Sequence, residues 1–177
     1  MDPMMEIIKR RRSVRCFEKR PLGRDLIDSI LEAARYAPTA RNLQQLDYKV
    51  FTNRRTINGI SDRINSIMEK NNESLPKGED PNVFYNAPLL ILITGPEENR
   101  WINSDAALAI QNIMLYATSI DLGTCFIGKA RYIDKDEELL TELHISKGRK
   151  IAGAVICGYP DETPEEKEKK ISIEFFK

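Results

Sequence analysis

The stretch DAALAIQNIMLYATSI, residues 105–120, is apolar on nearly every side when it is wound into a helix. Alanine, isoleucine, leucine and methionine recur at positions that leave almost no polar face. A helix of that kind is covered by protein all round. We therefore expect a long, buried central helix that starts near residue 104 and ends near residue 120. Its many alanines leave two arrangements open: burial in the core of one chain, or burial both there and against a second subunit.

A second buried element is predicted just before this helix. PLLILITG, residues 88–95, is a continuous apolar run of strand length, typical of a strand covered on both faces. Further strands are expected at residues 47–52, within 123–128 and at 151–159, and helices at 4–12, 25–36, 55–70 and 135–143, the last with Asp134 as its N-cap. This order predicts a single α+β domain over residues 1–177, with three layers: a mixed central sheet flanked by helices on both faces, and an extended C-terminal tail.

The composition excludes several classes of protein. Twenty-seven basic residues balance twenty-seven acidic ones among 177, so the chain as a whole is not built to bind a polyelectrolyte. Three widely spaced cysteines and a single histidine, His144, exclude a disulfide scaffold and a multi-histidine centre, and no metal site is expected. The sequence has no signal-peptide pattern and no apolar run of about 20 residues, so we expect a cytoplasmic protein without a membrane segment.

Basic residues gather in RRRSVRCF, residues 10–17. Three interpretations fit such a cluster: a solvated helix face, an arm for nucleic acid, or a socket for one compact anion. The alternation that follows Ser13 indicates an ordered extended segment, and the rest of the chain lacks the further basic and aromatic residues that a nucleic-acid surface needs. Guanidinium groups bind phosphate through two hydrogen bonds, and a serine hydroxyl can add a third. A single phosphate-bearing ligand is therefore favoured, with no nucleic-acid partner.

Two loops could complete a site for such a ligand. APTARNLQQ, residues 37–45, ends a helix at a proline and continues with hydrogen-bonding side chains, although a plain turn would have the same composition. In DLGTCFIGKA, residues 121–130, two glycines flank a short apolar strand and let the backbone approach a flat ligand. The dinucleotide motif G-x-G-x-x-G is absent. Cys125 has neither a base nor a charged residue beside it in sequence, which favours a small buried residue over a nucleophile.

The two most polar segments of the chain have open roles. Residues 71–82, NNESLPKGEDPN, are rich in turn formers and are a candidate lid. The tail GYPDETPEEKEKK, residues 158–170, carries three lysines that either are solvated or bring a second set of cations to the anion that Arg11 would bind. Glu18 and Asp105 are candidates to orient arginines, and His144 is given no role.

These segments, in this order and at these spacings, resemble the FMN-dependent nitroreductase family over nearly the whole chain. The resemblance is carried by RRRSVRCF, APTARNLQQ, NAPLLILI, DAALAIQNIMLYATSIDLGTCFIG and GYPDETPEEK. It implies a homodimer with FMN at the subunit interface and no side chain that acts as a nucleophile, because the chemistry takes place on the cofactor. The residues that it implies in cofactor binding are Arg11, Arg12, Ser13, Arg15, Pro38, Thr39, Ala40, Asn42, Gln44, Phe126, Ile127, Gly128, Lys167 and Lys169.

The resemblance also implies a role for each group of these residues. Arg11 and Ser13 would bind the phosphate, and the lysines of the tail would close around it. Arg12 would lie along the ribityl chain and Arg15 would approach the pyrimidine edge of the ring, where a cation stabilises the negative charge left by hydride uptake. Residues 38–44 would reach the flavin from the partner subunit. Residues 126–128 would line one face of the ring, with the backbone N–H of Gly128 near N5.

The implied activity is hydride transfer from NADH or NADPH through FMN to a small-molecule acceptor by a ping-pong mechanism. The acceptor would be a nitroaromatic, a quinone or a similar electron-poor compound. Two alternatives stay open: a dehydrogenase, dehalogenase or flavin-modifying enzyme with another electron donor, and a flavin-, nucleotide- or nucleic-acid-binding protein without turnover. Thr39, Ala40, Gln45, Phe126 and Lys169 depart from the residues usual in the family. The sequence therefore identifies neither the acceptor, nor the preferred nicotinamide, nor the number of electrons transferred at a time.

Overall fold

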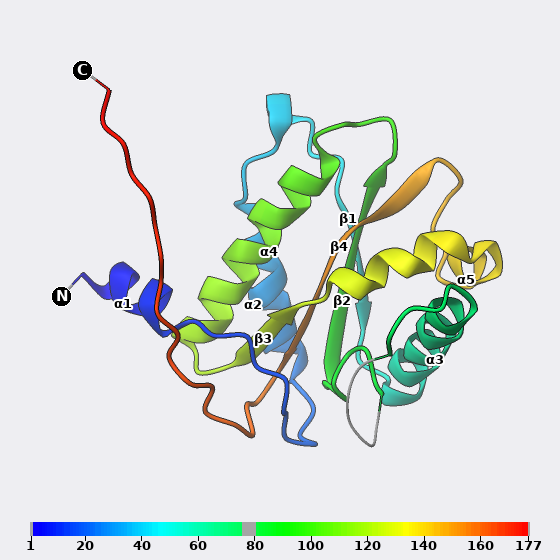
Figure 1. The fold of residues 1–177 in the computed structure, drawn as a ribbon, viewed down its shortest axis with the longest axis horizontal. Helices are drawn as coiled ribbons and strands as arrows, with labels where there is room; N and C mark the ends of the chain where they lie inside the picture. The colour runs from blue at the N-terminus through cyan, green and yellow to red at the C-terminus, as the bar shows by residue number, and fades with distance from the viewer. Residues whose placement is uncertain (1, 76–80, 177) are drawn as a thin grey trace.

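A four-stranded sheet between two layers of helices forms the body of this computed structural model, which describes residues 2–75 and 81–176 (Figure 1). The helices α1 (Pro3–Arg10), α2 (Arg24–Arg35) and α4 (Ile102–Ser119) lie on one side, and α3 (Arg54–Lys70) and α5 (Glu137–Glu142) lie on the other. The strands are β1 (Asp47–Phe51), β2 (Leu89–Pro96), β3 (Gly123–Phe126) and β4 (Arg149–Gly158). The expected three-layered α+β fold is confirmed.

The four strands follow the order β1-β2-β4-β3, and each pair of neighbours is antiparallel. The expectation of a mixed sheet was therefore wrong for these strands, and the parallel contact that the structure has at β3 is an isolated bridge between Ser13 and Thr124. The continuous apolar run of β2 reports cover on both faces, and helices can cover an antiparallel sheet in the same way. Strand direction is not encoded in such a run.

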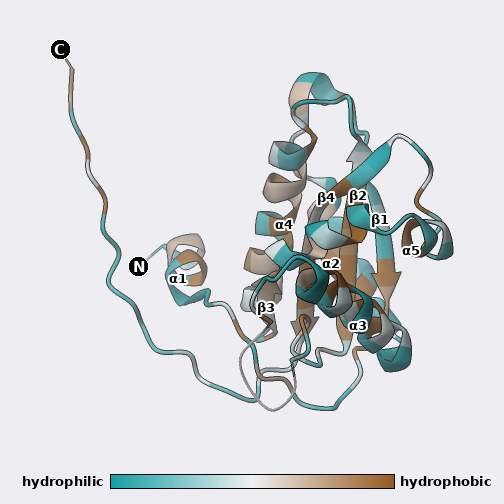
Figure 2. Cartoon of the chain, turned by 45° about the vertical axis from the view of Figure 1, so that its right-hand side comes forward, coloured by the Kyte–Doolittle hydropathy of each residue, from teal (hydrophilic) through white to brown (hydrophobic). Residues whose placement is uncertain are grey.

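Alternate residues of β2 enter two separate apolar clusters, as the two-residue period of a strand requires. Leu90 and Leu92 pack with α3, α5 and the 3₁₀ segment η2 (Gly128–Lys135). Leu89, Ile91 and Ile93 pack with α2 and α4. Hydrophobic colour accordingly runs along the strands and α4, and hydrophilic colour lies on the outer faces of the other helices (Figure 2).

The central helix α4 is buried along one face and exposed along another. Its inner positions, among them Ala106, Ala109, Ile110 and Ile113, have no exposed surface. A stripe that includes Ala107 and Gln111 is exposed, and the Leu108 side chain within it is 46% exposed. The expectation of complete burial was therefore wrong for a single chain, because no element of the same chain covers this stripe among the described residues. Burial against a second subunit stays a prediction.

The N-cap of α5 also differs from the predicted one. The Asp136 carboxylate accepts a hydrogen bond from the backbone N–H of Leu139 at 2.9 Å, which is the usual N-cap contact. Asp134 instead accepts from the backbone N–H of Ile151 at 2.8 Å and so joins η2 to β4. Two aspartates stand two residues apart here, and the sequence pattern alone could not separate their roles.

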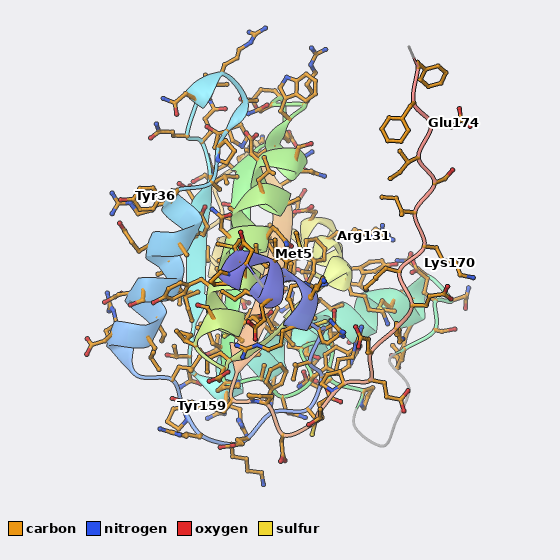
Figure 3. The ribbon with its side chains drawn as sticks, turned by 90° about the vertical axis from the view of Figure 1, so that its left-hand side faces the viewer. Met5, Tyr36, Arg131, Tyr159, Lys170 and Glu174 are labelled. Carbon is orange, nitrogen blue, oxygen red and sulfur yellow. The ribbon has the colours of Figure 1, made fainter. Side chains whose placement is uncertain are left out.

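The C-terminal tail is extended, as expected. It passes α1 and ends far from the sheet (Figure 1). Figure 3 shows Lys170 and Glu174 on this outer part, well apart from Tyr159 at the base of the tail. The last part exposes four large apolar side chains, which are Ile171, Ile173, Phe175 and Phe176.

The structure describes the candidate lid only in part. Residues 76–80 of the candidate lid lie outside the described residues. Its first residues are tied to the body, since the Tyr132 hydroxyl donates to the Glu73 carboxylate and the Glu73 N–H donates to the carbonyl of Met68 at 2.9 Å.

No helix in the described ranges combines the length and apolar character needed to cross a bilayer.

Candidate functional site

The basic segment is held in an extended conformation against the outer edge of β3. The backbone N–H of Val14 donates to the carbonyl of Thr124 at 2.9 Å, next to the bridge that pairs Ser13 with Thr124. Val14 is buried on Gly123, where an added Cβ would come within 2.9 Å of three Val14 side-chain carbons. The glycine therefore permits the close approach of the two chains.

In an extended segment, side chains two residues apart lie on the same side, so Ser13 and Arg15 are expected to share a side. Ser13, Arg15 and Arg11 all lie near enough to Cys125 to influence the pKa of its thiol. Burial of Cys125 is the largest influence and raises the pKa of its thiol, whereas the two guanidinium groups and the Ser13 hydroxyl act in the opposite direction. Two guanidinium groups and a hydroxyl, which are groups that bind a phosphate, therefore lie near the Cys125 thiol of β3, together with the Glu162 carboxylate, which acts to raise the thiol pKa.

Arg12 has a different set of partners. Its guanidinium donates to the carbonyl oxygens of Lys9 and of Arg11, the latter at 3.0 Å, and pairs with the Glu166 carboxylate at 3.1 Å. The predicted place of Arg12 along the ribityl chain stays a prediction, because these contacts involve the end of α1 and the tail. The neighbouring Arg10 ties the segment to the C-terminal end of α4 through the carbonyl of Thr118.

The base of the tail is joined to the basic segment through the backbone. The Glu18 N–H donates to the carbonyl of Tyr159, and the Asp161 N–H donates to the carbonyl of Cys16, both at 2.9 Å. Glu162 then accepts hydrogen bonds from the backbone N–H groups of Arg15 and Cys16. Sequence reasoning missed these contacts because they are made by main-chain groups.

The predicted return of Lys167 and Lys169 to the phosphate stays untested. Both lysines are exposed on the outer tail, and the described contacts that tail side chains make with the basic segment come from Glu162 and Glu166 instead. The tail therefore does approach the basic segment, although the side chains that meet it are acidic.

The end of β3 offers an open surface beside this segment. The Phe126 side chain is 45% exposed, and a Cβ added at Gly128 would meet nothing within 4 Å. Ile127 between them is buried in the core, and its backbone N–H donates to the carbonyl of Ala154 at 2.9 Å. Of the three predicted ring-facing residues, Phe126 and Gly128 are thus open, whereas Ile127 could contribute only through its backbone.

Tyr85 joins the site although no sequence pattern indicates it. The Arg15 guanidinium lies 5.8 Å from the centre of the Tyr85 ring, within reach of a cation–π contact. Tyr85 and Asn86 both have positive φ angles, of 52° and 54°. The side chain of Asn82 holds the turn, because its oxygen accepts from the Phe84 N–H at 2.9 Å. A turn that forces two non-glycine residues into the left-handed region is costly and is typical of functional sites.

The loop of residues 38–45 lies at the opposite end of α4 from the basic segment. The backbone N–H of Ala40 donates to the Asp105 carboxylate at 2.9 Å. Asp105 therefore holds this loop, whereas we had expected it to orient an arginine. Pro38, Asn42 and Gln44 are exposed, and Thr39 and Ala40 are half-buried. Asp105 and Thr118, which mark the two ends, are about 20 Å apart along the axis of α4 at 1.5 Å per residue.

One chain therefore assembles part of the predicted site. It brings together the basic segment, the end of β3, the base of the tail and Tyr85, and it leaves the 38–45 loop at a distance.

The chemistry of the described side chains fits a cofactor site better than a nucleophilic or metal centre. Burial raises the pKa of the Cys157 thiol to about 12 and also raises that of Cys125, so neither thiol is ionised at neutral pH. No cluster of three or more histidine, cysteine, aspartate or glutamate side chains with metal-binding geometry occurs within residues 2–75 and 81–176.

Comparisons with known proteins agree with this interpretation. A provisionally named NADH dehydrogenase/NAD(P)H nitroreductase of Methanothermobacter thermautotrophicus is 29% identical over 166 residues, which are 91% of this chain and 79% of the relative. A provisionally named NAD(P)H nitroreductase of Bacillus subtilis is 28% identical over 177 residues, with 94% and 89% of the two chains covered.

Solved structures extend the likeness to the whole fold. The crystal structure of a nitroreductase with bound FMN from Bacteroides fragilis superposes with a TM-score of 0.90 at 28% identity, over 100% of both chains. An FMN-dependent nitroreductase from Clostridium difficile shares the fold with a TM-score of 0.84 at 21% identity, over 99% of both chains. The model of the nitroreductase family matches residues 8–159, a range that includes the basic segment, the 38–45 loop and the whole sheet. This chain belongs to the nitroreductase family.

Proposed function

We propose that this protein is an FMN-dependent oxidoreductase that takes hydride from NADH or NADPH and delivers it to nitroaromatic, quinone or similar electron-poor acceptors by a ping-pong mechanism. The observation that carries the proposal is the face made by Arg11, Ser13 and Arg15 beside the open surface at Gly128. It supplies cations and a hydroxyl for a phosphate near the end of β3, where a Cβ added at Gly128 would meet nothing within 4 Å and a flat ring would have room. The names of the relatives and the FMN bound in the Bacteroides fragilis nitroreductase support it.

The residues present fit FMN. Arg11 and Ser13 would bind the phosphate, and Arg15 would place its charge at the pyrimidine edge of the ring, with Tyr85 behind it. The ring would lie against the Gly128 backbone, because the space that a Cβ would enter at this position is open. FMN supplies the hydride chemistry when it is bound. The protein binds and orients it, holds positive charge beside it and limits the access of water.

We further propose that the working unit is a homodimer in which each FMN site combines the basic segment of one chain with the 38–45 loop of its partner. The separation of about 20 Å along α4 between these two parts supports this arrangement. The exposed apolar side chains on α4, on α1 and at the end of the tail support it too, since such a surface is typical of an interface. The partner's tail could then bring Lys167 and Lys169 to the phosphate. A cytoplasmic location is consistent with three free cysteines.

The purified protein tests the proposal directly. We expect it to be yellow, or to bind added FMN, with the absorbance bands of an oxidised flavin. Anaerobic titration with NADH or NADPH should bleach those bands, and a nitroaromatic or a quinone should restore them. A colourless protein that does not bind FMN would contradict the proposal. A flavoprotein that dithionite bleaches but neither nicotinamide does would favour the alternative enzyme with another electron donor.

A further inference from the structure

A buried carboxylate on α4 binds the backbone of a loop that is distant in sequence. Asp105 lies in the first turn of α4 and is only 3% exposed. Its Oδ1 accepts a hydrogen bond at 2.9 Å from the backbone N–H of Ala40, a residue 65 positions earlier in the chain. Burying a carboxylate is unfavourable unless hydrogen bonds compensate it. The contact therefore points to a specific task for this side chain.

The segment that Asp105 holds is strained. Arg41, Asn42 and Gln44 have φ angles of 53°, 55° and 51°, in the left-handed region that non-glycine residues rarely adopt. Strain of this kind persists only where the surroundings impose it, and it is concentrated at ligand-binding sites. Left to itself, the loop would relax to a more common conformation.

Contacts at both ends of the loop impose the strained conformation. Inside the loop, the Gln44 N–H donates to the Thr39 hydroxyl at 3.1 Å and the Gln44 side chain donates to Asn42 at 2.9 Å. At the far end, Arg149 donates to the carbonyl of Gln45 at 2.9 Å. At the near end, the side-chain tether that the structure provides is Asp105. These contacts leave Asn42 and Gln44 exposed and fixed in place.

We propose that Asp105 is a positioning residue for cofactor binding: it holds the 38–45 loop in the strained conformation that presents Asn42 and Gln44 to FMN. This inference rests on the proposed function, in which the loop reaches the flavin of the partner subunit. The place of Asp105 in the first turn of α4 suits the role, since the positive end of the helix dipole stabilises a buried negative charge there. The carboxylate thus stays a strong acceptor for the Ala40 N–H.

Three variants isolate the contact. Asp105→Ala removes the acceptor, and Asp105→Asn keeps an oxygen that can still accept. Ala40→Pro removes the donor while Asp105 stays in place. The backbone tolerates this proline, because Thr39 before it is extended, with φ −124° and ψ 150°, and because Ala40 is the first residue of the 3₁₀ turn η1 (Ala40–Asn42).

FMN affinity of the dimer, measured by quenching of flavin fluorescence, is the first readout. We expect Asp105→Ala and Ala40→Pro each to weaken FMN binding about 10-fold and Asp105→Asn to weaken it less than about 3-fold, by the usual worth of one buried hydrogen bond. The double variant should bind no more weakly than either single variant, since both remove the same contact.

Asn112→Ala is the matched control. Asn112 lies on the same helix and donates to the carbonyl of Ala33 on α2 at 3.1 Å, so this variant also loses one contact between α4 and a neighbouring segment. We expect it to lower the melting temperature and to leave FMN affinity unchanged. Equal losses of affinity in Asn112→Ala and Asp105→Ala would assign Asp105 a merely structural role and overturn the proposal, as would wild-type affinity in Asp105→Ala.

Limited trypsin digestion of the FMN-free protein gives a second readout that needs no cofactor. Arg41 is an exposed cleavage site within the loop. We expect cleavage after Arg41 to be at least about 5-fold faster in Asp105→Ala than in the wild type and near the wild-type rate in Asp105→Asn, because a released loop opens more often. Equal rates in all three proteins would overturn the proposal. A wild-type protein that binds no FMN but shows this pattern would refute the proposed function while leaving the tether in place.

Discussion

The two ends of α4 hold their neighbouring segments in different ways. At the C-terminal end, the basic segment is paired with β3 and with the base of the tail through main-chain hydrogen bonds. At the N-terminal end, the 38–45 loop is held by side chains, with Asp105 and Arg149 binding its backbone. The first segment has ordinary extended geometry, whereas the second contains three non-glycine residues with positive φ.

The basic segment and the 38–45 loop are expected to contribute to ligand binding in different ways. A segment that is paired with a sheet edge presents its side chains in alternation, so that Ser13 and Arg15 are expected to share a side. A loop that is held by side chains can adopt a shape that no regular element offers, but it depends on each of them. We therefore expect the basic segment to supply most of the binding energy for an anion and the loop to supply geometry.

The largest effect is expected from loss of the phosphate-binding groups. The double variant Arg11→Ala/Ser13→Ala should weaken FMN binding by about 10²–10³-fold, because a hydrogen bond to a charged group is worth about 1.5–3 kcal/mol. Equilibrium titration with FMN measures this loss. Arg24→Ala is the control, since the Arg24 guanidinium is exposed and paired with Asp28 at 2.8 Å. Comparable losses in both variants would mean that overall charge, and not this face, binds the anion.

Mixing two variants that each bind FMN poorly tests whether the basic segment and the 38–45 loop meet across subunits. A chain with Arg11→Ala/Ser13→Ala and a chain with Asn42→Ala/Gln44→Ala should each bind FMN poorly as homodimers. After unfolding and joint refolding, one site of each heterodimer combines the intact regions, so that about a quarter of all sites should bind FMN tightly at random pairing. Separate refolding is the control. If the mixture binds no more FMN than the separate proteins, the two regions do not form one site across the interface.

Gly123 and Gly128 test two different roles within the first region: packing for Gly123 and contact with the ligand for Gly128. Gly123→Ala should lower the free energy of unfolding by about 1–3 kcal/mol, because its Cβ would overlap the stiff Val14 side chain. Gly128→Ala should change it by less than about 0.5 kcal/mol, since nothing lies within 4 Å of the added Cβ. The second variant should still weaken FMN binding if the ring occupies that space. Denaturant unfolding and FMN titration measure the two effects, and a stable Gly128→Ala protein with full affinity would place the ring elsewhere.

The smallest effect concerns the thiols, which report on the same region. Iodoacetamide should modify exposed Cys16 in the native protein and spare Cys125 and Cys157, because burial raises the pKa of both buried thiols and blocks access to them. Mass spectrometry should find one modified cysteine in the native protein and three after denaturation. In Gly123→Ala the Cys125 thiol should become reactive, whereas in Asp105→Ala it should stay protected. The reverse pattern would contradict the separation of the two regions.

Much of the fold was predictable from sequence because the apolar pattern reports burial. The predicted helices over 25–36 and 55–70 correspond to α2 (Arg24–Arg35) and α3 (Arg54–Lys70), and the apolar run at 88–95 corresponds to β2. The errors fell where the pattern carries no information. A run covered on both faces does not give strand direction, and two aspartates near the start of α5 fit a cap equally well.

The candidate site was predictable only in part, for a similar reason. The alternation after Ser13 predicted an extended segment, and the structure shows it paired with β3. Tyr85 could not be found in this way, because a turn with positive φ brings it to Arg15 and no periodic pattern marks such a turn. Asp105 was expected to orient an arginine, but its partner is a backbone N–H, which every residue except proline carries.

The sequence by itself determined which residues are buried, where the elements lie and which chemical groups are available, since these follow from local periodicity and side-chain chemistry. Only the tertiary structure decided which of those groups meet. It paired the basic segment with β3 and the tail, and it placed the 38–45 loop at the other end of α4. The physical reason is that such contacts depend on the direction of strands and on main-chain hydrogen bonds, which are common to all residues and leave no trace in the pattern of side chains.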